Sequence, residues 1–308
     1  MRAGAEPRPS EIAPERLWHE RLQHERPVQG ASRRHWLLGA AASLTGLRAT
    51  AAAAAAPAEP LSSWDHITRH NNYYEFSTAK DVVWKLAEEF RPEPWTLTVE
   101  GAVQRPRTWG FDELLKAFAQ EDRVYRLRCV EGWSIVVPWR GFALAPLLAA
   151  TAPLSSAKYV EFISVLRPAE MIGQRRPVLA WPYREALRID EAMHPLTLMA
   201  TGLYGKPLPS QNGAPLRLAV PWKYGFKSAK AITHIRFAEQ PPVTSWMAAA
   251  PSEYGFLANV NPEVAHPRWS QRREHRLGEM AKRDTSPFNG YAAEVAAMYA
   301  GMDLAKHF

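Results

Sequence analysis

The stretch YRLRCVEGWSIVVPW, residues 125–139, decides how the rest of the chain is interpreted. It contains Cys129, the only cysteine among 308 residues. Residues 124–130 alternate in polarity, which predicts a half-buried strand with Arg126 and Arg128 on one face and Cys129 on the other. A single thiol excludes an intrachain disulfide, a four-cysteine iron–sulfur cluster, a zinc ribbon and a C-x-x-C-H haem attachment.

Three interpretations of Cys129 remain open from the residues alone. A free cysteine is most often a small buried hydrophobic side chain. A nucleophilic cysteine needs a histidine base, and no histidine here lies in a recognisable protease signature. A metal thiolate must be deprotonated, and the charges of the two nearby arginines would lower the pKa of the thiol at short range.

The composition is that of a globular chain long enough to bury a full core. Hydrophobic residues make up 46% and charged residues 22% of the sequence. The 26 prolines predict many ordered loops between short elements. The net charge is +7, but the basic residues are scattered and form no long run. We therefore expect no nucleic-acid partner.

The first 56 residues predict an export signal. Arg33 and Arg34 precede the apolar run 36–47, and an alanine tract follows. This run is too short to span a bilayer, which needs about 20 residues, but it suits a signal-peptide core. The paired arginines match the twin-arginine signature, with a basic n-region for general secretion as the alternative. We expect removal of residues 1–56, leaving a single catalytic domain over residues 57–308 in the periplasm.

The rest of the chain predicts an α+β fold. Neither G-x-G-x-x-G nor a P-loop motif is present, which argues against dinucleotide-binding and P-loop folds. Period-2 and helical-period patterns predict strands at 95–101, 157–165, 216–222 and 231–239, and helices at 111–119 and, broken at Pro195, at 190–202.

Four blocks of the sequence, in the same order, resemble the sulfite oxidase fold family. YRLRCVEGWSIVVPWRGF, residues 125–142, is similar to the segment that carries the molybdenum ligand in that family. The other blocks are NNYYEF at 71–76, residues 187–232 with their QNGAP and PWKYGFK motifs, and EYGFLANVNPEVAHPRWSQ at 253–271. The closest likeness is to bacterial members that reduce oxidised methionine in periplasmic proteins. The resemblance implies a sulfite oxidase-like molybdopterin-binding fold of mixed sheets with short helices.

The cofactor implied by the resemblance is Mo-molybdopterin, with one pyranopterin dithiolene and no added nucleotide. Cys129 would be the sole protein ligand to molybdenum, a metal that soft sulfur ligands suit. The resemblance assigns these further residues to the cofactor: Asn71, Tyr74, Glu75, Ser164, Asn212, Arg217, Ser228, Ala229 and Lys230. Taken singly, the turn at Asn212 is more often structural, and an arginine such as Arg217 is more often solvated or salt-bridged. Within the family pattern, Arg217 would meet the cofactor phosphate with a bidentate fork.

The implied reaction is reduction of methionine sulfoxide in periplasmic proteins by oxygen-atom transfer, which consumes two electrons and two protons. Glu131 is expected to donate or relay a proton. The alternative is a structural carboxylate paired with Arg126 or Arg128. The sequence has no haem or cluster motif, so the resemblance implies a membrane haem b subunit that passes electrons from the quinone pool.

Two other functions remain open at this stage. The first is another oxygen-atom transferase of the same fold, acting on sulfite or on small S- or N-oxides. The second is a cofactor-free periplasmic binding protein in which the cysteine is merely buried. Metal analysis and assays with sulfite and oxidised methionine would separate the three.

Overall fold

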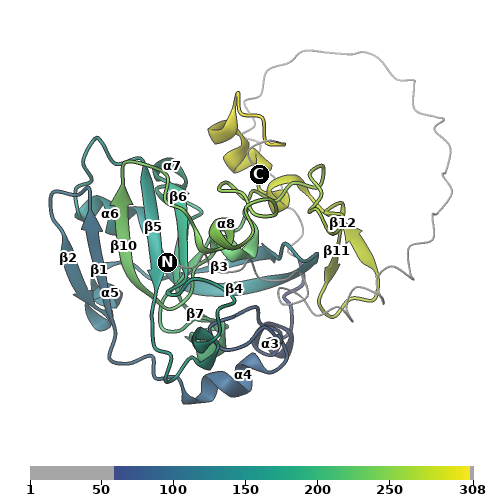
Figure 1. Ribbon diagram of the computed structural model, residues 1–308, viewed down its shortest axis with the longest axis horizontal. Helices are drawn as coiled ribbons and strands as arrows, with labels where there is room; N and C mark the ends of the chain where they lie inside the picture. Colours follow the sequence, from purple (N-terminus) through teal and green to yellow (C-terminus); the bar gives the residue numbers. More distant parts are fainter. Residues whose placement is uncertain (1–58, 306–308) are drawn as a thin grey trace, which may run out of the picture.

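Two mixed β-sheets organise residues 59–305, the part of the chain that the computed structural model describes (Figure 1). The predicted signal peptide, residues 1–56, lies outside this range. The presence of mixed sheets with short helices confirms the predicted α+β class. No helix within residues 59–305 combines the length and the apolar character needed to cross a bilayer.

The first sheet has five strands in the order β2-β1-β10-β5-β6. Strand β1 runs parallel to β10, and the other neighbours are antiparallel. The strands are β1 (Thr96–Gly101), β2 (Arg107–Gly110), β5 (Tyr159–Ser164), β6 (Arg184–Arg188) and β10 (Ile232–Ala238). The predicted strands at 95–101, 157–165 and 231–239 are thereby confirmed.

The second sheet is built around the hairpin that carries Cys129. Its main path is β12-β11-β4-β7-β8, with β3 paired to β4 and β9 paired to β7. The strands are β3 (Glu121–Arg128), β4 (Trp133–Ala143), β7 (Leu198–Leu203), β8 (Lys206–Pro207), β9 (Arg217–Ala219), β11 (Arg273–Arg276) and β12 (Lys282–Asp284). The predicted strands at 124–130 and 216–222 are thus present with shifted or shorter bounds.

Short helices connect and cover the sheets. The α-helices are α3 (Trp64–Thr68), α4 (Val83–Leu86), α5 (Phe111–Ala117), α6 (Leu144–Ala150), α7 (Ile189–Ala192), α8 (Ser245–Ala249) and α9 (Ala292–Val295). The 3-10 helices are η1 (Ala87–Glu89), η2 (Ile172–Arg175), η3 (Ser210–Asn212), η4 (Gly225–Lys227), η5 (Pro287–Gly290) and η6 (Ala296–Tyr299). Helix α5 confirms the helix predicted at 111–119; Asp112 and Glu113 lie in its first turn, where the helix dipole favours acidic side chains.

The helix predicted at 190–202 is wrong from residue 193 onward. Helix α7 ends at Ala192, before Pro195, and the chain continues as the fully buried strand β7. This strand pairs with β4 on one side and with β9 on the other. Pairing on both edges satisfies its backbone groups and outweighs the helical spacing of its apolar residues.

One hydrophobic cluster contains side chains of both sheets, among them Val99 and Phe237 of the first sheet and Val137 and Leu198 of the second. The two sheets therefore share a core. The loops that leave the edges of this core carry the residues of the site described next.

Candidate active site

Cys129 lines a cavity of ≈ 950 Å³, a volume that includes space open to solvent. The cavity walls come from segments far apart in the sequence, between Ile67 and Tyr254. Of the residues assigned to the cofactor or to catalysis, these line it: Asn71, Tyr74, Glu75, Cys129, Glu131, Asn212, Arg217 and Lys230. The tertiary structure thus brings most of the predicted site together.

The thiol lies in a tight turn between β3 and β4. The Cys129 amide donates to Trp133 O at 2.9 Å, and the Gly132 amide donates to Cys129 O at 3.1 Å. Gly132 has a φ of +88°, which favours glycine at this position. The strand was expected to run past the cysteine, but β3 ends at Arg128. The turn therefore aims Cys129 and Glu131 into the same cavity, although they are not neighbours on one strand face.

Two donors contact the sulfur of Cys129. Asn72 Nδ2 lies 3.3 Å from Sγ, and the backbone amide of Glu131 lies 3.5 Å from it. Burial, and after it the negative charge of Glu131, raise the pKa of the thiol to about 12. Arg128 lowers the pKa, as expected, and so does Lys80, but burial outweighs both and the net shift is upward. A metal bound here would displace the thiol proton.

Glu131 forms an ion pair that sequence reasoning missed. Its Oε2 lies 3.0 Å from Lys80 Nζ and accepts a hydrogen bond from Trp133 Nε1 at 3.2 Å. The alternative pairing of Glu131 with Arg126 or Arg128 is wrong: these arginines pair with Glu59 and Glu274, behind the turn. The partner is Lys80 because the loop after the NNYYEF block packs against the turn, a contact that local spacing cannot reveal.

Asn71 and Asn212 are oriented by a single carbonyl. The Nδ2 atoms of both side chains donate to Ile67 O at 2.9 Å. Their Oδ1 atoms are buried and have no hydrogen-bond partner. Leaving such acceptors without donors is costly, by about 1–3 kcal/mol each. Two side chains that line the cavity thus offer fixed acceptors to a ligand that carries N–H groups, as a pterin does.

Arg217 and Lys230 place positive charge on the cavity wall. Arg217 is 4% exposed and donates to Asn212 O at 2.9 Å, while its guanidinium lies 4.9 Å from the Trp139 ring centroid. Arg217 forms no ion pair with a carboxylate within residues 59–305, and the carboxylate that acts on Lys230 is that of Glu75. Burial lowers the pKa of Arg217 to about 10 and that of Lys230 to about 8. The buried Arg217, with the half-buried Lys230 beside it, suits an anionic ligand group such as a phosphate.

Glu75 shares this part of the cavity. Burial raises the pKa of its carboxyl to about 7, while the positive charge of Lys230 opposes the shift. The carboxyl can therefore act as a hydrogen-bond donor or acceptor toward a heterocycle near neutral pH.

Ser164, Ser228 and Ala229 lie behind the wall, outside the cavity lining. Ser164 Oγ donates to Lys230 O at 2.7 Å, and Ser228 Oγ accepts from the Val220 amide at 3.4 Å. Ala229 O accepts from the Leu218 amide at 2.9 Å. In the described structure these three residues fix the loop that presents Lys230.

Several cavity residues were not predicted. Asn72 adjoins the predicted Asn71 in the NNYYEF block, so that motif could have indicated it. Trp246 and Tyr254 form an aromatic wall, with ring centroids 4.7 Å apart, and Tyr74 meets Trp246 edge-on at 5.4 Å. Lys80 carried no sequence signal because its role depends on the tertiary contact with Glu131.

The donor set fits a metal whose ligands come mainly from a cofactor. Within residues 59–305 no group of three or more His, Cys, Asp or Glu side chains could hold a metal ion. The cavity instead offers one thiol, three amide oxygens without hydrogen-bond partners (Asn71, Asn72 and Asn212) and the cations Arg217 and Lys230. A pyranopterin with its dithiolene and phosphate would satisfy each of these groups, so the residues present fit Mo-molybdopterin.

Comparisons with known proteins agree with this chemistry. The family described as "Oxidoreductase molybdopterin binding domain" matches residues 84–246. Two relatives bear the name "Protein-methionine-sulfoxide reductase catalytic subunit MsrP". The protein from Xanthomonas axonopodis pv. citri is 56% identical over 82% of this chain and 80% of its own length. The protein from Burkholderia mallei is 50% identical over 97% of this chain and 95% of its own.

Among solved structures, the sulfane dehydrogenase SoxCD from Paracoccus pantotrophus is similar with a TM-score of 0.42 and 18% identity, over 50% of this chain and 40% of that one. The sequence relatives are far closer and cover most of both chains. The chain belongs to the molybdopterin-binding oxidoreductases and, among them, to the family of protein-methionine-sulfoxide reductase catalytic subunits.

Proposed function

We propose that this protein reduces methionine sulfoxide in oxidised proteins to methionine, at a molybdenum that Cys129 holds. The observation that carries the proposal is the cavity itself. A lone thiol lines it together with the buried Arg217, the half-buried Lys230 and three amide oxygens that lack donors. The names of the two close relatives supply the substrate class.

The reaction converts a sulfoxide, two electrons and two protons into a thioether and water. Bound Mo-molybdopterin supplies the two-electron chemistry and the place to which oxygen is transferred. Glu131 is proposed to hold and deliver a proton, because its carboxylate lines the cavity two residues from Cys129. Lys80 and Trp133 fix the position of that carboxylate.

The aromatic wall is suited to the thioether part of the substrate. Tyr74, Trp246 and Tyr254 line the cavity, and sulfur–aromatic contacts contribute about 0.3–1.5 kcal/mol each. We propose that a methionine side chain of a protein client enters against this wall.

The cofactor contacts follow the same pattern. Asn71, Tyr74, Glu75, Asn212, Arg217 and Lys230 are proposed to contact the pterin and its phosphate directly. Ser164, Ser228 and Ala229 are proposed to support Lys230 from behind.

The electron donor and the cellular location are further parts of the proposal. Electrons would come from a membrane haem b subunit linked to the quinone pool; the relatives' printed name, "catalytic subunit", supports a second subunit. The Arg33–Arg34 pair supports twin-arginine export of the folded protein to the periplasm, with residues 1–56 removed and 57–308 forming one domain.

Sulfite oxidation is the principal competing function. A site for the sulfite anion calls for several arginines that converge on the metal. Among the described residues that line the cavity, Arg217 is the one arginine. This supports a neutral sulfoxide as the substrate rather than sulfite.

Elemental analysis and a pair of assays test the proposal. The purified protein should contain about one molybdenum per chain. With a reduced dye as donor, it should reduce an oxidised protein that contains methionine sulfoxide and leave sulfite unoxidised. A protein without molybdenum, or one that oxidises sulfite and ignores the sulfoxide, would refute the assignment.

A further inference from the structure

The Cys129 turn is held from behind by a segment that lies beyond the recognised domain. The molybdopterin-binding match ends at residue 246, yet β11 of the C-terminal segment pairs with β4 directly beside the turn. His275 pairs with Trp133, and the His275 amide donates to Gly132 O at 2.9 Å. The C-terminal segment is therefore part of the scaffold of the cysteine.

Two consecutive carbonyls of the turn accept hydrogen bonds from side chains. Arg128 donates from its guanidinium to Cys129 O. Gln271 Nε2 and Trp269 Nε1 both donate to Val130 O, each at 2.7 Å. These bonds fix the peptide planes on both sides of Val130, and hence the backbone that carries the sulfur of Cys129.

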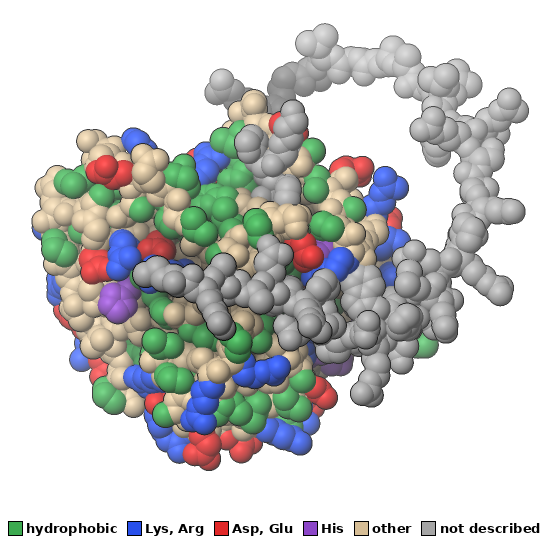
Figure 2. Space-filling model, in the orientation of Figure 1, with side chains coloured by type: hydrophobic (Ala, Val, Ile, Leu, Met, Phe, Trp, Pro, Cys, Tyr) green, Lys and Arg blue, Asp and Glu red, His purple; other side chains and the backbone are tan. Residues whose placement is uncertain are grey.

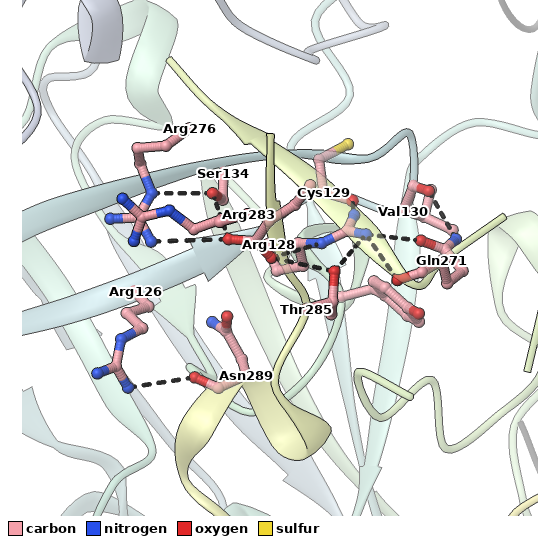
Figure 3. Close-up of polar contacts among 12 residues, drawn as sticks. Arg126, Arg128, Cys129, Val130, Ser134, Gln271, Arg276, Arg283, Thr285 and Asn289 are labelled. Carbon is pink, nitrogen blue, oxygen red and sulfur yellow. Dashed lines mark hydrogen bonds and ion pairs between the residues drawn. The ribbon is translucent and has the colours of Figure 1, made fainter. Parts of the chain in front are cut away.

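Gln271 connects the two anchors (Figure 3). Its Oε1 accepts from Arg128 Nη2 at 2.9 Å, while its Nε2 donates to Val130 O. The side chain is 2% exposed. Arg128, fully buried, is held in turn by Glu274, whose Oε2 lies 2.9 Å from Nε. The buried side-chain amide of Gln271 thus connects the Arg128 guanidinium to the carbonyl of Val130, the residue after Cys129.

We propose that Gln271 is a positioning residue that sets the orientation of the Cys129 sulfur toward molybdenum. Gln271 does not itself line the cavity or contact the sulfur, and it acts through the Val130 carbonyl of the turn. Partners that orient metal ligands in this way typically change affinity or activity by about 10–100-fold when they are removed. This inference rests on the proposed role of Cys129 as the metal ligand.

Two substitutions distinguish the hydrogen bond of Gln271 to Arg128 from its hydrogen bond to Val130 O. Gln271→Leu removes both hydrogen bonds. Gln271→Glu keeps an acceptor for Arg128 but places a carboxylate oxygen against Val130 O. If Val130 O is the anchor, both variants should retain molybdenum but show an altered electron paramagnetic resonance spectrum of the metal. Turnover should fall about 10-fold, with KM for the sulfoxide unchanged.

Gln120→Leu serves as the matched control. Gln120 also bridges two groups, because it donates to Phe118 O at 3.0 Å and accepts from Thr201 Oγ1 at 2.9 Å, but it does not line the cavity or contact the turn. Its variant should keep the wild-type spectrum. If the Gln271 variants fold, bind molybdenum and give the wild-type spectrum and turnover, the positioning role is refuted. Absence of molybdenum from the wild-type protein would refute the proposed function instead, so the two failures are distinguishable.

Discussion

Buried arginines form ion pairs behind the Cys129 turn but not on the cavity wall. Behind the Cys129 turn, Arg128 and Glu274 are both buried and pair at 2.9 Å. Glu274 also accepts from Ser134 Oγ at 2.7 Å, and Arg276 contacts the same hydroxyl (Figure 3). On the cavity wall, Arg217 forms no ion pair among the described residues, although it is also buried.

This difference in ion pairing distinguishes the residues that support the turn from those that bind a ligand. A buried pair with its hydrogen bonds complete needs nothing further and fixes the geometry around it. A buried cation without a counterion raises the energy of the empty protein until an anion arrives. The space-filling view shows acidic and basic side chains interspersed over the face it presents, with no single-sign patch (Figure 2). We therefore place the anion-binding function in the cavity rather than on that face.

The largest expected effect comes from the thiol itself. Cys129→Ser replaces the only thiol in the chain. Molybdenum content and sulfoxide reductase activity should both fall to background, while the fold is kept because serine is similar in size. Metal analysis with circular dichroism measures this; a folded variant with full molybdenum would remove Cys129 as the ligand.

The next prediction contrasts the paired arginine with the unpaired one. Arg128→Leu leaves Glu274 buried without its partner and should lower the free energy of unfolding by about 3–5 kcal/mol. Arg217→Leu removes an uncompensated charge and should leave the stability of the cofactor-free protein unchanged or raise it, while reducing cofactor content. Urea denaturation of the cofactor-free protein measures the free energy of unfolding of both variants. Equal losses of stability in the two variants would contradict the distinction between the paired and the unpaired arginine.

A smaller effect is expected at Glu131. Glu131→Gln keeps the size of the side chain but removes the carboxylate. The variant therefore loses the negative charge beside Lys80 and the ability to take up and deliver a proton. Turnover should fall about 100-fold, as for the loss of a general acid, with molybdenum still bound. Steady-state kinetics together with metal analysis provides the measurement. Unchanged turnover would leave Glu131 with a structural role only.

The smallest effect concerns pH and the cavity wall. Because burial raises the pKa of Glu75 from 4.5 to about 7, the unfolded chain ionises this group first as the pH rises. Glu75 therefore lowers the stability of the cofactor-free protein between pH 4.5 and 7, with no further change above pH 7. Glu75→Gln should flatten this part of the stability profile. A profile identical to that of the wild type would place the carboxyl in a more polar setting than the structure shows.

The sequence predicted which residues line the cavity better than it predicted the contacts among them. The family blocks indicated the thiol and most of the cavity wall because those residues lie in short motifs. Ser228 and Ala229 lie in one of these blocks, and Ser164 ends strand β5, but all three lie behind the wall, where sequence position alone does not reveal which side a residue faces. The partners of Glu131 and Arg128 came from segments distant along the chain, and no local spacing encodes such pairs.

The sequence alone determined that a metal here can take only one thiolate from the protein, because the chain has a single cysteine. It also determined the strands and the helix whose apolar period is regular and local. Tertiary structure decided that residues 198–203 form a strand, because pairing on both edges satisfies buried backbone groups. It also decided which charges are paired, because a buried ion pair depends on where separate segments meet in space.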